Sequence, residues 1–151
     1  MIICYLALGS NLKTPERQIR LAIQVIRKLP RTHLVAVAPF YFNPAVGRKA
    51  QPAYCNTVVK IGTHLSPPDL HQQCIAIEKT HLRVRKMRWG ARSLDIDILY
   101  YGNSTIQTNL LTIPHPRIFE RPFVLEPLKY LQQESASDQD QTLLLRRIAF
   151  R

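Results

Sequence analysis

The 151-residue sequence lacks the short motifs by which many nucleotide-binding and metal-binding proteins are identified. It has no G-x-x-x-x-G-K-[ST] phosphate loop, no H-R-D or D-F-G of a protein kinase, and no G-x-S-x-G nucleophile elbow. Its three cysteines are far apart and form no C-x-x-C, so neither a zinc site nor a disulfide framework is indicated. We therefore expect buried, reduced thiols, and any phosphate binding must depend on arginines and metal ions.

Acidic residues and long apolar runs are also scarce. The chain has 10 acidic residues against 21 lysines and arginines, which gives a net charge of +11. This balance favours anionic partners such as nucleic acid, nucleotides or phosphorylated metabolites, and does not choose among them. The apolar run at residues 2–8 is too short to cross a bilayer and has no basic leader before it. We expect a cytoplasmic protein without membrane contact.

The order of apolar runs, turns and helix-start signals predicts a β-α-β-β-α-β chain. The expected strands are residues 2–8, 33–38, 54–61 and 93–101, and the helices begin at Thr14-Pro15-Glu16 and Ser66-Pro67-Pro68-Asp69. This order is typical of an α+β, ferredoxin-like fold, with both helices on one face of an antiparallel sheet and C-terminal additions. The other face is left for loops and ligand. We expect one domain over residues 1–151, with a divergent tail at 132–151.

The segments between these elements are predicted to be irregular. Residues 39–52 read as a loop and residues 83–90 as a basic loop. After a turn at residues 102–103, the chain through residues 114–116 reads as a coil before a short helix that begins near Pro122. The polar stretch 132–141 is expected to be a loop before a short terminal helix at residues 143–150.

Two aspartates alternate with apolar residues on the fourth expected strand. Strand side chains alternate between faces, so Asp95 and Asp97 point to one side while Ile96 and Ile98 point to the other. The two carboxylates repel each other, and a divalent cation between them removes this repulsion. Mg²⁺ binds a few carboxylates together with water and substrate phosphates, so the pattern indicates a magnesium site. A solvated strand face that carries two acids is the alternative.

A basic segment without acids precedes this strand and contains Lys79, Arg83, Arg85, Lys86, Arg88 and Arg92. Because the planar arginine side chain can donate two hydrogen bonds to one phosphate, several arginines could bind a triphosphate. Trp89, the only tryptophan, lies among these cations and could stack on a flat ring. A solvated charge run and a partial core anchor are the respective alternatives.

Further candidates, each of which also fits an ordinary structural role, are Tyr54, Asn56, Glu78, His115, Arg121 and Phe123. Tyr54 and Asn56 share one face of the third strand. The amide of Asn56 has both a hydrogen-bond acceptor and donors, which suit it to bind the edge of a heterocycle. Arg121 is a further candidate phosphate ligand.

These residues resemble the 6-hydroxymethyl-7,8-dihydropterin pyrophosphokinase family from about residue 5 to residue 128. The matching segments are Ala7-Leu8-Gly9-Ser10-Asn11-Leu12, Arg83-Val84-Arg85, Arg92-Ser93-Leu94-Asp95-Ile96-Asp97-Ile98, Thr112-Ile113-Pro114-His115 and Arg121-Pro122-Phe123-Val124. The resemblance implies transfer of pyrophosphate from ATP to the pterin hydroxymethyl group, with release of AMP, in folate biosynthesis. We expect a monomer that acts on these two small molecules and not on nucleic acid.

The resemblance also implies a role for individual residues. Asp95 and Asp97 would hold two Mg²⁺ ions and, with Arg83 and Arg92, would be catalytic. The implied ATP-binding residues are Glu78, Arg83, Arg85, Arg92, Ile98, Thr112, His115 and Arg121. The implied pterin-binding residues are Asn43, Pro44, Val46, Tyr54, Asn56, Trp89 and Phe123.

Some positions depart from the family pattern. Asn43 stands where threonine is expected, Ile75 where glutamine is common, and Pro116 where tyrosine is common. The loop between Arg85 and Trp89 is one residue short. A catalytically weakened homologue is therefore one alternative to an active enzyme.

An RNA-binding ferredoxin-like module is the alternative from another class of protein. Such a module predicts a K/R-G-F/Y-G/A-F-V-x-F/Y segment on the sheet, and the sequence contains none. Asp95 and Asp97 would also repel RNA phosphates from that face unless a metal were bound.

Overall fold

A computed structural model describes residues 1–11, 14–43, 54–85 and 94–135 of the chain. For residues 43, 81–85 and 134–135 it describes the backbone alone.

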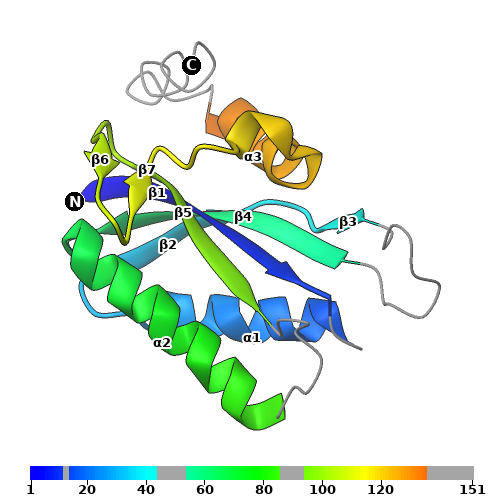
Figure 1. Cartoon of the computed structure of the whole chain (residues 1–151). Helices are drawn as coiled ribbons and strands as arrows, with labels where there is room; N and C mark the ends of the chain where they lie inside the picture. The colour runs from blue at the N-terminus through cyan, green and yellow to red at the C-terminus, as the bar shows by residue number, and fades with distance from the viewer. Residues whose placement is uncertain (12–13, 44–53, 86–93, 136–151) are drawn as a thin grey trace.

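Within the described residues, five strands form one antiparallel sheet at the centre of the fold (Figure 1). Four of them lie in the order β2-β4-β1-β5, with bounds Thr32–Val37, Tyr54–Thr63, Ile2–Ser10 and Asp95–Tyr101. The short strand β3, Tyr41–Asn43, pairs with the first residues of β4. This order is that of the predicted ferredoxin-like fold, which is confirmed. It leaves β5 as an edge strand.

Two helices cover one face of the sheet, as predicted (Figure 1). In α1, Pro15–Arg27, the buried residues Ile19, Ala22, Ile23 and Ile26 recur at helical spacing and join the core cluster. In α2, Pro67–Arg85, the Asp69 backbone N–H donates to Ser66 Oγ at 3.3 Å, so Ser66 caps the helix. From the sheet, Cys4, Leu6 and Leu8 of β1 and the apolar residues Ile96 and Ile98 of β5 belong to the same cluster.

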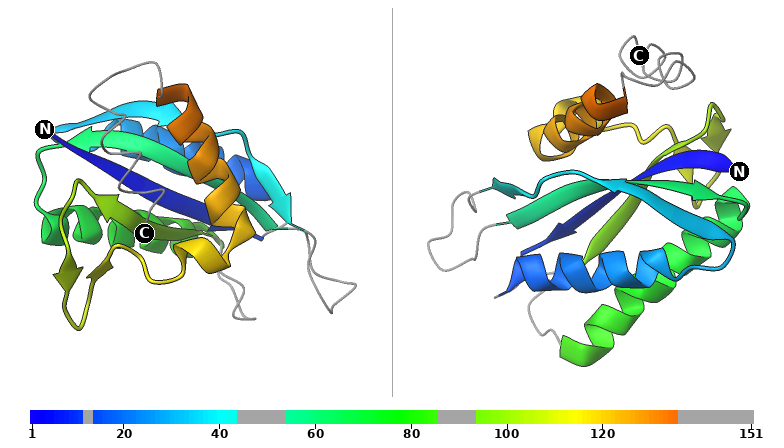
Figure 2. Two further views of the ribbon diagram at one scale, coloured as in Figure 1. Left: turned by 90° about the horizontal axis from the view of Figure 1, so that it is seen from above. Right: turned by 180° about the vertical axis from the view of Figure 1, so that it is seen from behind.

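A third helix lies on the opposite face of the sheet, where the sequence predicted loops and ligand (Figure 2). This is α3, Pro122–Ser135, whose buried residues Val124, Leu128 and Leu131 form a second apolar cluster with residues of β1, β4 and β5. The expected short helix is therefore longer than predicted, and the polar loop does not begin at residue 132. The i, i+4, i+7 spacing of these three residues explains why this segment packs as a helix.

Other short elements were also missed by the sequence prediction. The loop at residues 39–52 contains β3, and the expected coil contains the hairpin β6–β7, Ile106–Gln107 and Thr112–Ile113, and the 3₁₀ helix η1, Ile118–Glu120. Helix α2 continues to Arg85 through the start of the expected basic loop. Two- and three-residue strands carry almost no periodic signal, because pairing with a neighbour decides them. The predicted terminal helix at residues 143–150 and the rest of the basic loop lie outside the described residues.

No helix among the described residues is long and apolar enough to cross a membrane. The three cysteines are unpaired and buried, as the sequence predicted. Burial raises the pKa of Cys4 to about 12 and that of Cys55 to about 11. The pKa of Cys74 rises to about 12, through burial first and then through the nearby charges of Glu78 and Asp97.

We predict that all three thiols are inert in the folded protein at neutral pH. They are buried, and their raised pKa values leave almost no thiolate, which is the reactive form. The measurement is the rate of reaction with a chromogenic disulfide such as Ellman's reagent, with and without concentrated guanidinium. We expect slow labelling in buffer and rapid labelling of three thiols after unfolding. Rapid labelling of any thiol in native buffer would contradict the buried placement.

Candidate active site

The two aspartates of β5 point together to the face of the sheet that carries α3, as the alternation predicted. Ile96 and Ile98, between and after them, are buried against the helices on the other face. Asp95 and Asp97 are partly exposed and line one cavity. Along β5, apolar side chains that face the core therefore alternate with carboxylates that face the cavity.

The central strand β1 contributes the smallest side chains next to these carboxylates. Gly9 lies opposite Asn56 of β4 on one side and opposite Asp95 of β5 on the other. Ala7 lies opposite Asp97, one pleat further along. Gly9 and Ala7 are smaller than the residues opposite them on β4 and β5, so the sheet surface is hollow at this point.

The hollow is a cavity of about 320 Å³. Its lining residues come from β1, β4, β5 and the start of α3, and are Ala7, Leu8, Gly9, Tyr54, Asn56, Thr57, Asp95, Asp97, Arg121, Phe123 and Val124. The guanidinium carbon of Arg121 lies 5.9 Å from the centre of the Phe123 ring, which is within the range of a cation–π contact. The cavity thus combines two aromatic side chains, one amide, two carboxylates and one cation.

Asn56 has an unusual position in this cavity. Its side chain is 6% exposed, and its Nδ2 has no hydrogen-bond partner within the described part of the chain. A buried donor without an acceptor is unfavourable by about 1–3 kcal/mol. An acceptor on a ligand in the cavity would remove this penalty.

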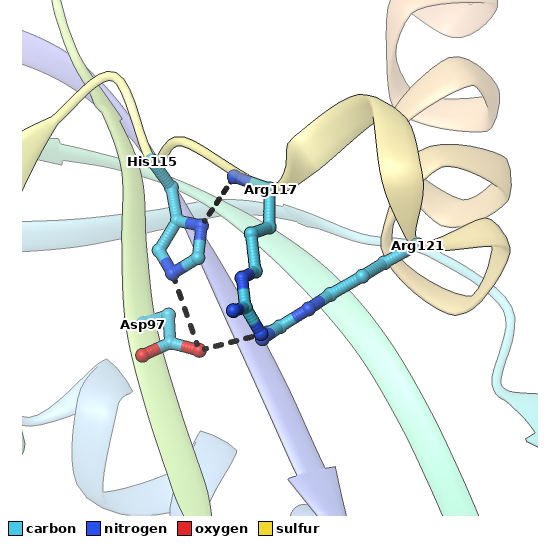
Figure 3. A network of polar contacts seen from close by, with 4 residues as sticks. All are labelled: Asp97, His115, Arg117 and Arg121. Carbon is cyan, nitrogen blue, oxygen red and sulfur yellow. Dashed lines mark hydrogen bonds and ion pairs between the residues drawn. The ribbon is translucent and has the colours of Figure 1, made fainter.

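Asp97 lies between two cationic or protonatable side chains (Figure 3). Its Oδ2 is 4.0 Å from Nε2 of His115 and 3.9 Å from Nη1 of Arg121. Both distances are too long for hydrogen bonds, and the Asp97 side chain is 44% exposed, so the contact with Arg121 is a weak, screened ion pair. The three groups are therefore close enough to act on one ligand while not being locked to one another.

A β-bulge positions His115. The pairing of β1 with β5 shifts between Tyr5 and Leu6, so Leu99 is an extra residue in β5. The Leu99 carbonyl accepts a hydrogen bond from the backbone N–H of His115 at 3.0 Å. This bond fixes the segment after β7 to the edge of β5 and brings the imidazole beside Asp97.

One hydrogen bond of the His115 imidazole indicates which ring nitrogen carries the proton, and the surroundings of the ring determine its charge. The backbone N–H of Arg117 donates to His115 Nδ1 at 3.2 Å, so the proton of the neutral ring is on Nε2, the nitrogen that faces Asp97. Burial lowers the pKa of His115 below its usual value, and although Asp97 opposes this shift, Arg121 and Arg117 add to it. The ring is therefore neutral at pH 7 in the protein without ligands.

A second cavity, of about 280 Å³, lies along the outer edge of β5. It is lined by His71, Ile96, Asp97, Ile98, Leu110, Leu111, Thr112, His115 and Pro116. Among the residues that the structure describes, Asp97 alone lines both cavities. An edge strand has backbone N–H and C=O groups that point outward, so this cavity offers main-chain hydrogen bonds as well as side chains.

The structure brings together many of the residues that the sequence singled out. Tyr54, Asn56, Asp95, Asp97, Arg121 and Phe123 line the first cavity, and Ile98, Thr112 and His115 line the second. Glu78 of α2 lines neither. The side chains of Asn43, Arg83 and Arg85, and all of Pro44, Val46, Trp89 and Arg92, lie outside the described residues.

Sequence reasoning missed several residues of the site. His71, Leu110 and Leu111 line the second cavity, and Arg117 holds the imidazole of His115 through its backbone. None of these positions carries a motif signal. The chain reversal between β6 and β7 places Leu110 and Leu111, whereas His71 comes from α2 and Arg117 from the segment after β7. Gly9 was part of a matched segment, but its proximity to Asn56 depends on strand register.

A family model described as 7,8-dihydro-6-hydroxymethylpterin-pyrophosphokinase (HPPK) matches residues 5–133. The chain belongs to this family. Family membership confirms the resemblance drawn from the short segments of the sequence.

Curated relatives agree with this HPPK assignment. The chain is 49% identical over 128 residues to 2-amino-4-hydroxy-6-hydroxymethyldihydropteridine pyrophosphokinase of Haemophilus influenzae, a match that covers 85% of this chain and 80% of that protein. Proteins of the same name are 44% identical over 124 residues in Pseudomonas aeruginosa, covering 82% and 76%, and 37% identical over 132 residues in Bacillus subtilis, covering 87% and 79%.

The carboxylates of this HPPK chain suit a hard divalent cation whose remaining ligands come from a substrate and water. Asp95 and Asp97 supply two carboxylates to one cavity, and the described residues contain no group of three or more His, Cys, Asp or Glu that could hold a metal ion by themselves. Mg²⁺ commonly takes one or two carboxylates and fills its remaining positions with water and phosphate oxygens. A site of two carboxylates is therefore suited to a metal that arrives with a polyphosphate.

We predict that His115 makes stability depend on pH. Its folded pKa lies below the unfolded value of about 6.5, so protonation favours the unfolded chain as pH falls below that value. The unfolding free energy of wild type should therefore decrease from about pH 8 to about pH 5 more steeply than that of His115→Gln. His33→Gln, at an exposed position of β2, is the control and should keep the wild-type slope. Equal slopes in wild type and His115→Gln would contradict the assignment.

Proposed function

We propose that this member of the family transfers pyrophosphate from ATP to the hydroxymethyl group of 6-hydroxymethyl-7,8-dihydropterin and releases AMP. The observation that carries the proposal is the pair of cavities that meet at Asp97. One has aromatic walls and a buried amide, which suit a flat heterocycle, and the other runs along an open strand edge, which suits a nucleotide. The reacting groups of the two substrates would meet between them.

The first cavity would bind the pterin. Tyr54 and Phe123 provide apolar ring surfaces, and the Nδ2 of Asn56 is a buried donor directed to an acceptor on the heterocycle. The sequence resemblance adds Asn43, Pro44, Val46 and Trp89 to this binding site. A ring with hydrogen-bonding atoms along one edge would use both kinds of contact.

The second cavity would bind ATP. Ile98 and Thr112 line it, and the outward edge of β5 can pair with the edge of a base. His115 and Arg121 lie on either side of Asp97 and would bind phosphate oxygens, together with Arg83, Arg85 and Arg92. Glu78 would lie near the nucleotide. Neutral His115 donates from Nε2, so it can bond to a phosphate without adding charge.

The proposed reaction is an in-line displacement. The pterin hydroxyl oxygen bonds to the β-phosphorus, the bond from that phosphorus to the α,β-bridging oxygen breaks, and AMP leaves with the electron pair while the hydroxyl proton passes to solvent. Asp95 and Asp97 would hold two Mg²⁺ ions, which supply charge neutralisation of the phosphates and a lowered pKa for a bound hydroxyl. The protein's own contribution is to align the two substrates and to stabilise the transition-state charge with Arg121 and His115.

The alternative functions are less well supported. In an RNA-binding module of this fold the sheet face opposite α1 and α2 is the binding surface, and here α3 packs on part of that face. A catalytically weakened homologue differs from the proposed enzyme in rate alone.

The direct test of this function is to mix the protein with ATP, Mg²⁺ and hydroxymethyldihydropterin and to identify the nucleotide product by chromatography. The proposal predicts AMP and the pterin pyrophosphate ester in equal amounts. ADP as the product, or no product, would overturn the reaction type. Omitting Mg²⁺ should abolish turnover.

We predict that Asp97→Asn lowers the rate of AMP formation by about a hundredfold or more, because the site loses one of its two metal-binding charges at almost constant shape. Glu126→Gln, which changes an exposed acid on α3, is the control and should retain the wild-type rate. The thermal stability of both variants should be close to that of wild type. A wild-type rate for Asp97→Asn would contradict the role of Asp97.

We further predict that Asn56→Ala weakens pterin binding by about tenfold or more and leaves ATP binding unchanged. The amide lines the first cavity and not the second, and its loss removes the buried donor. Titration calorimetry with each substrate separately would measure both affinities. An equal loss of ATP and pterin affinity would show that the amide supports the fold and not one ligand.

A further inference from the structure

Gly9 lies at the centre of the row of residues that crosses the first cavity. Its partner on β4 is Asn56, and its partner on β5 is Asp95. Paired residues in adjacent strands point to the same face of a sheet, so a side chain at this position would enter the space between the amide and the carboxylate.

A single methyl group is already too large for this space. A Cβ built on Gly9 would lie 2.6 Å from Oδ1 of Asn56, a separation that real Cβ atoms essentially never show. The next nearest atom is Cγ of the same residue, at 3.7 Å, which is ordinary contact. The amide oxygen of Asn56 is therefore the atom that requires the absence of a Cβ at this position.

The amide could accommodate a methyl group only by turning or moving away. Asn56 is 6% exposed, and its Nδ2 makes no hydrogen bond to the described residues that would hold the amide in its present orientation. The absence of a Cβ on Gly9 allows the amide oxygen to lie this close to β1. The position of the amide determines where Nδ2 meets a ligand.

We propose that Gly9 is a positioning residue for the heterocycle, because its missing side chain allows the Asn56 amide to lie against β1 and present Nδ2 to the ring edge. The inference rests on the proposed function, since the ring in this cavity is the pterin. Gly9→Ala would keep the strand and displace the amide. The expected defect is in pterin recognition and not in the fold or in ATP binding.

Gly62 provides a matched control on the same sheet. A Cβ there would also be too close to a side chain, at 2.5 Å from Sδ of Met1. Met1 is 60% exposed and flexible, so its side chain can move aside, and Gly62 lines neither cavity. Gly62→Ala thus repeats the chemical change and the close contact, away from the site.

The experiment measures pterin affinity by titration calorimetry in wild type, Gly9→Ala, Gly62→Ala, Asn56→Ala and the double variant Gly9→Ala/Asn56→Ala. An ATP analogue with a methylene group at the α,β-bridge is present at saturation, so that no transfer occurs. We expect Gly9→Ala to lose about tenfold or more in pterin affinity, and Gly62→Ala to lose none. The affinity for the ATP analogue should be the same in all five proteins.

The double variant separates positioning from a structural role. If Gly9 acts through Asn56, adding Gly9→Ala to Asn56→Ala should cause no further loss, whereas independent effects would multiply. Multiplying losses, or an unchanged pterin affinity in Gly9→Ala, would overturn the proposal. If Gly9→Ala alone does not fold, a folded double variant supports the close contact with the amide, and an unfolded one overturns it. Failure of wild type to bind pterin would instead reject the proposed function.

Discussion

The antiparallel register of β4, β1 and β5 places Asn56, Gly9 and Asp95 in one row across the sheet, and the site depends on that row. A shift of one residue in either pairing would turn every side chain of the shifted strand to the opposite face. The amide and the carboxylates would then face α1 and α2, and the apolar residues between them would face the cavity. The apolar core under the sheet therefore holds the register that the polar face needs.

The same alternation explains how a small domain can contain a hollow without losing its core. Leu6 and Leu8 of β1 are almost completely buried against α1 and α2, while Ala7 and Gly9 between and after them leave room on the other face. The hollow remains open because α3 packs over the sheet beside it and contributes one wall through Phe123 and Val124. The absence of large side chains on one strand is thus a structural feature of the site.

The charged and polar groups of the two cavities meet at Asp97. Asp97 faces both cavities and lies within 4.0 Å of His115 and Arg121 in contacts that are too long for hydrogen bonds. Such contacts can be exchanged for contacts with a ligand at a small cost in free energy, because Asp97 has no hydrogen bond to His115 or Arg121 that must be broken first. Weak contacts of this kind suit a site that binds a highly charged ligand.

The sequence by itself determined the four long strands, the starts of both covering helices, the ferredoxin-like order and the direction of Asp95 and Asp97, because long apolar periods and helix caps are local signals. It also identified the family from short segments. The tertiary structure alone decided that His115 reaches Asp97, since a β-bulge at Leu99 anchors its backbone, and that Gly9 meets Asn56, since strand register brings them together across 47 positions of sequence. Contacts between distant segments leave no periodic trace, so packing and pairing had to supply them.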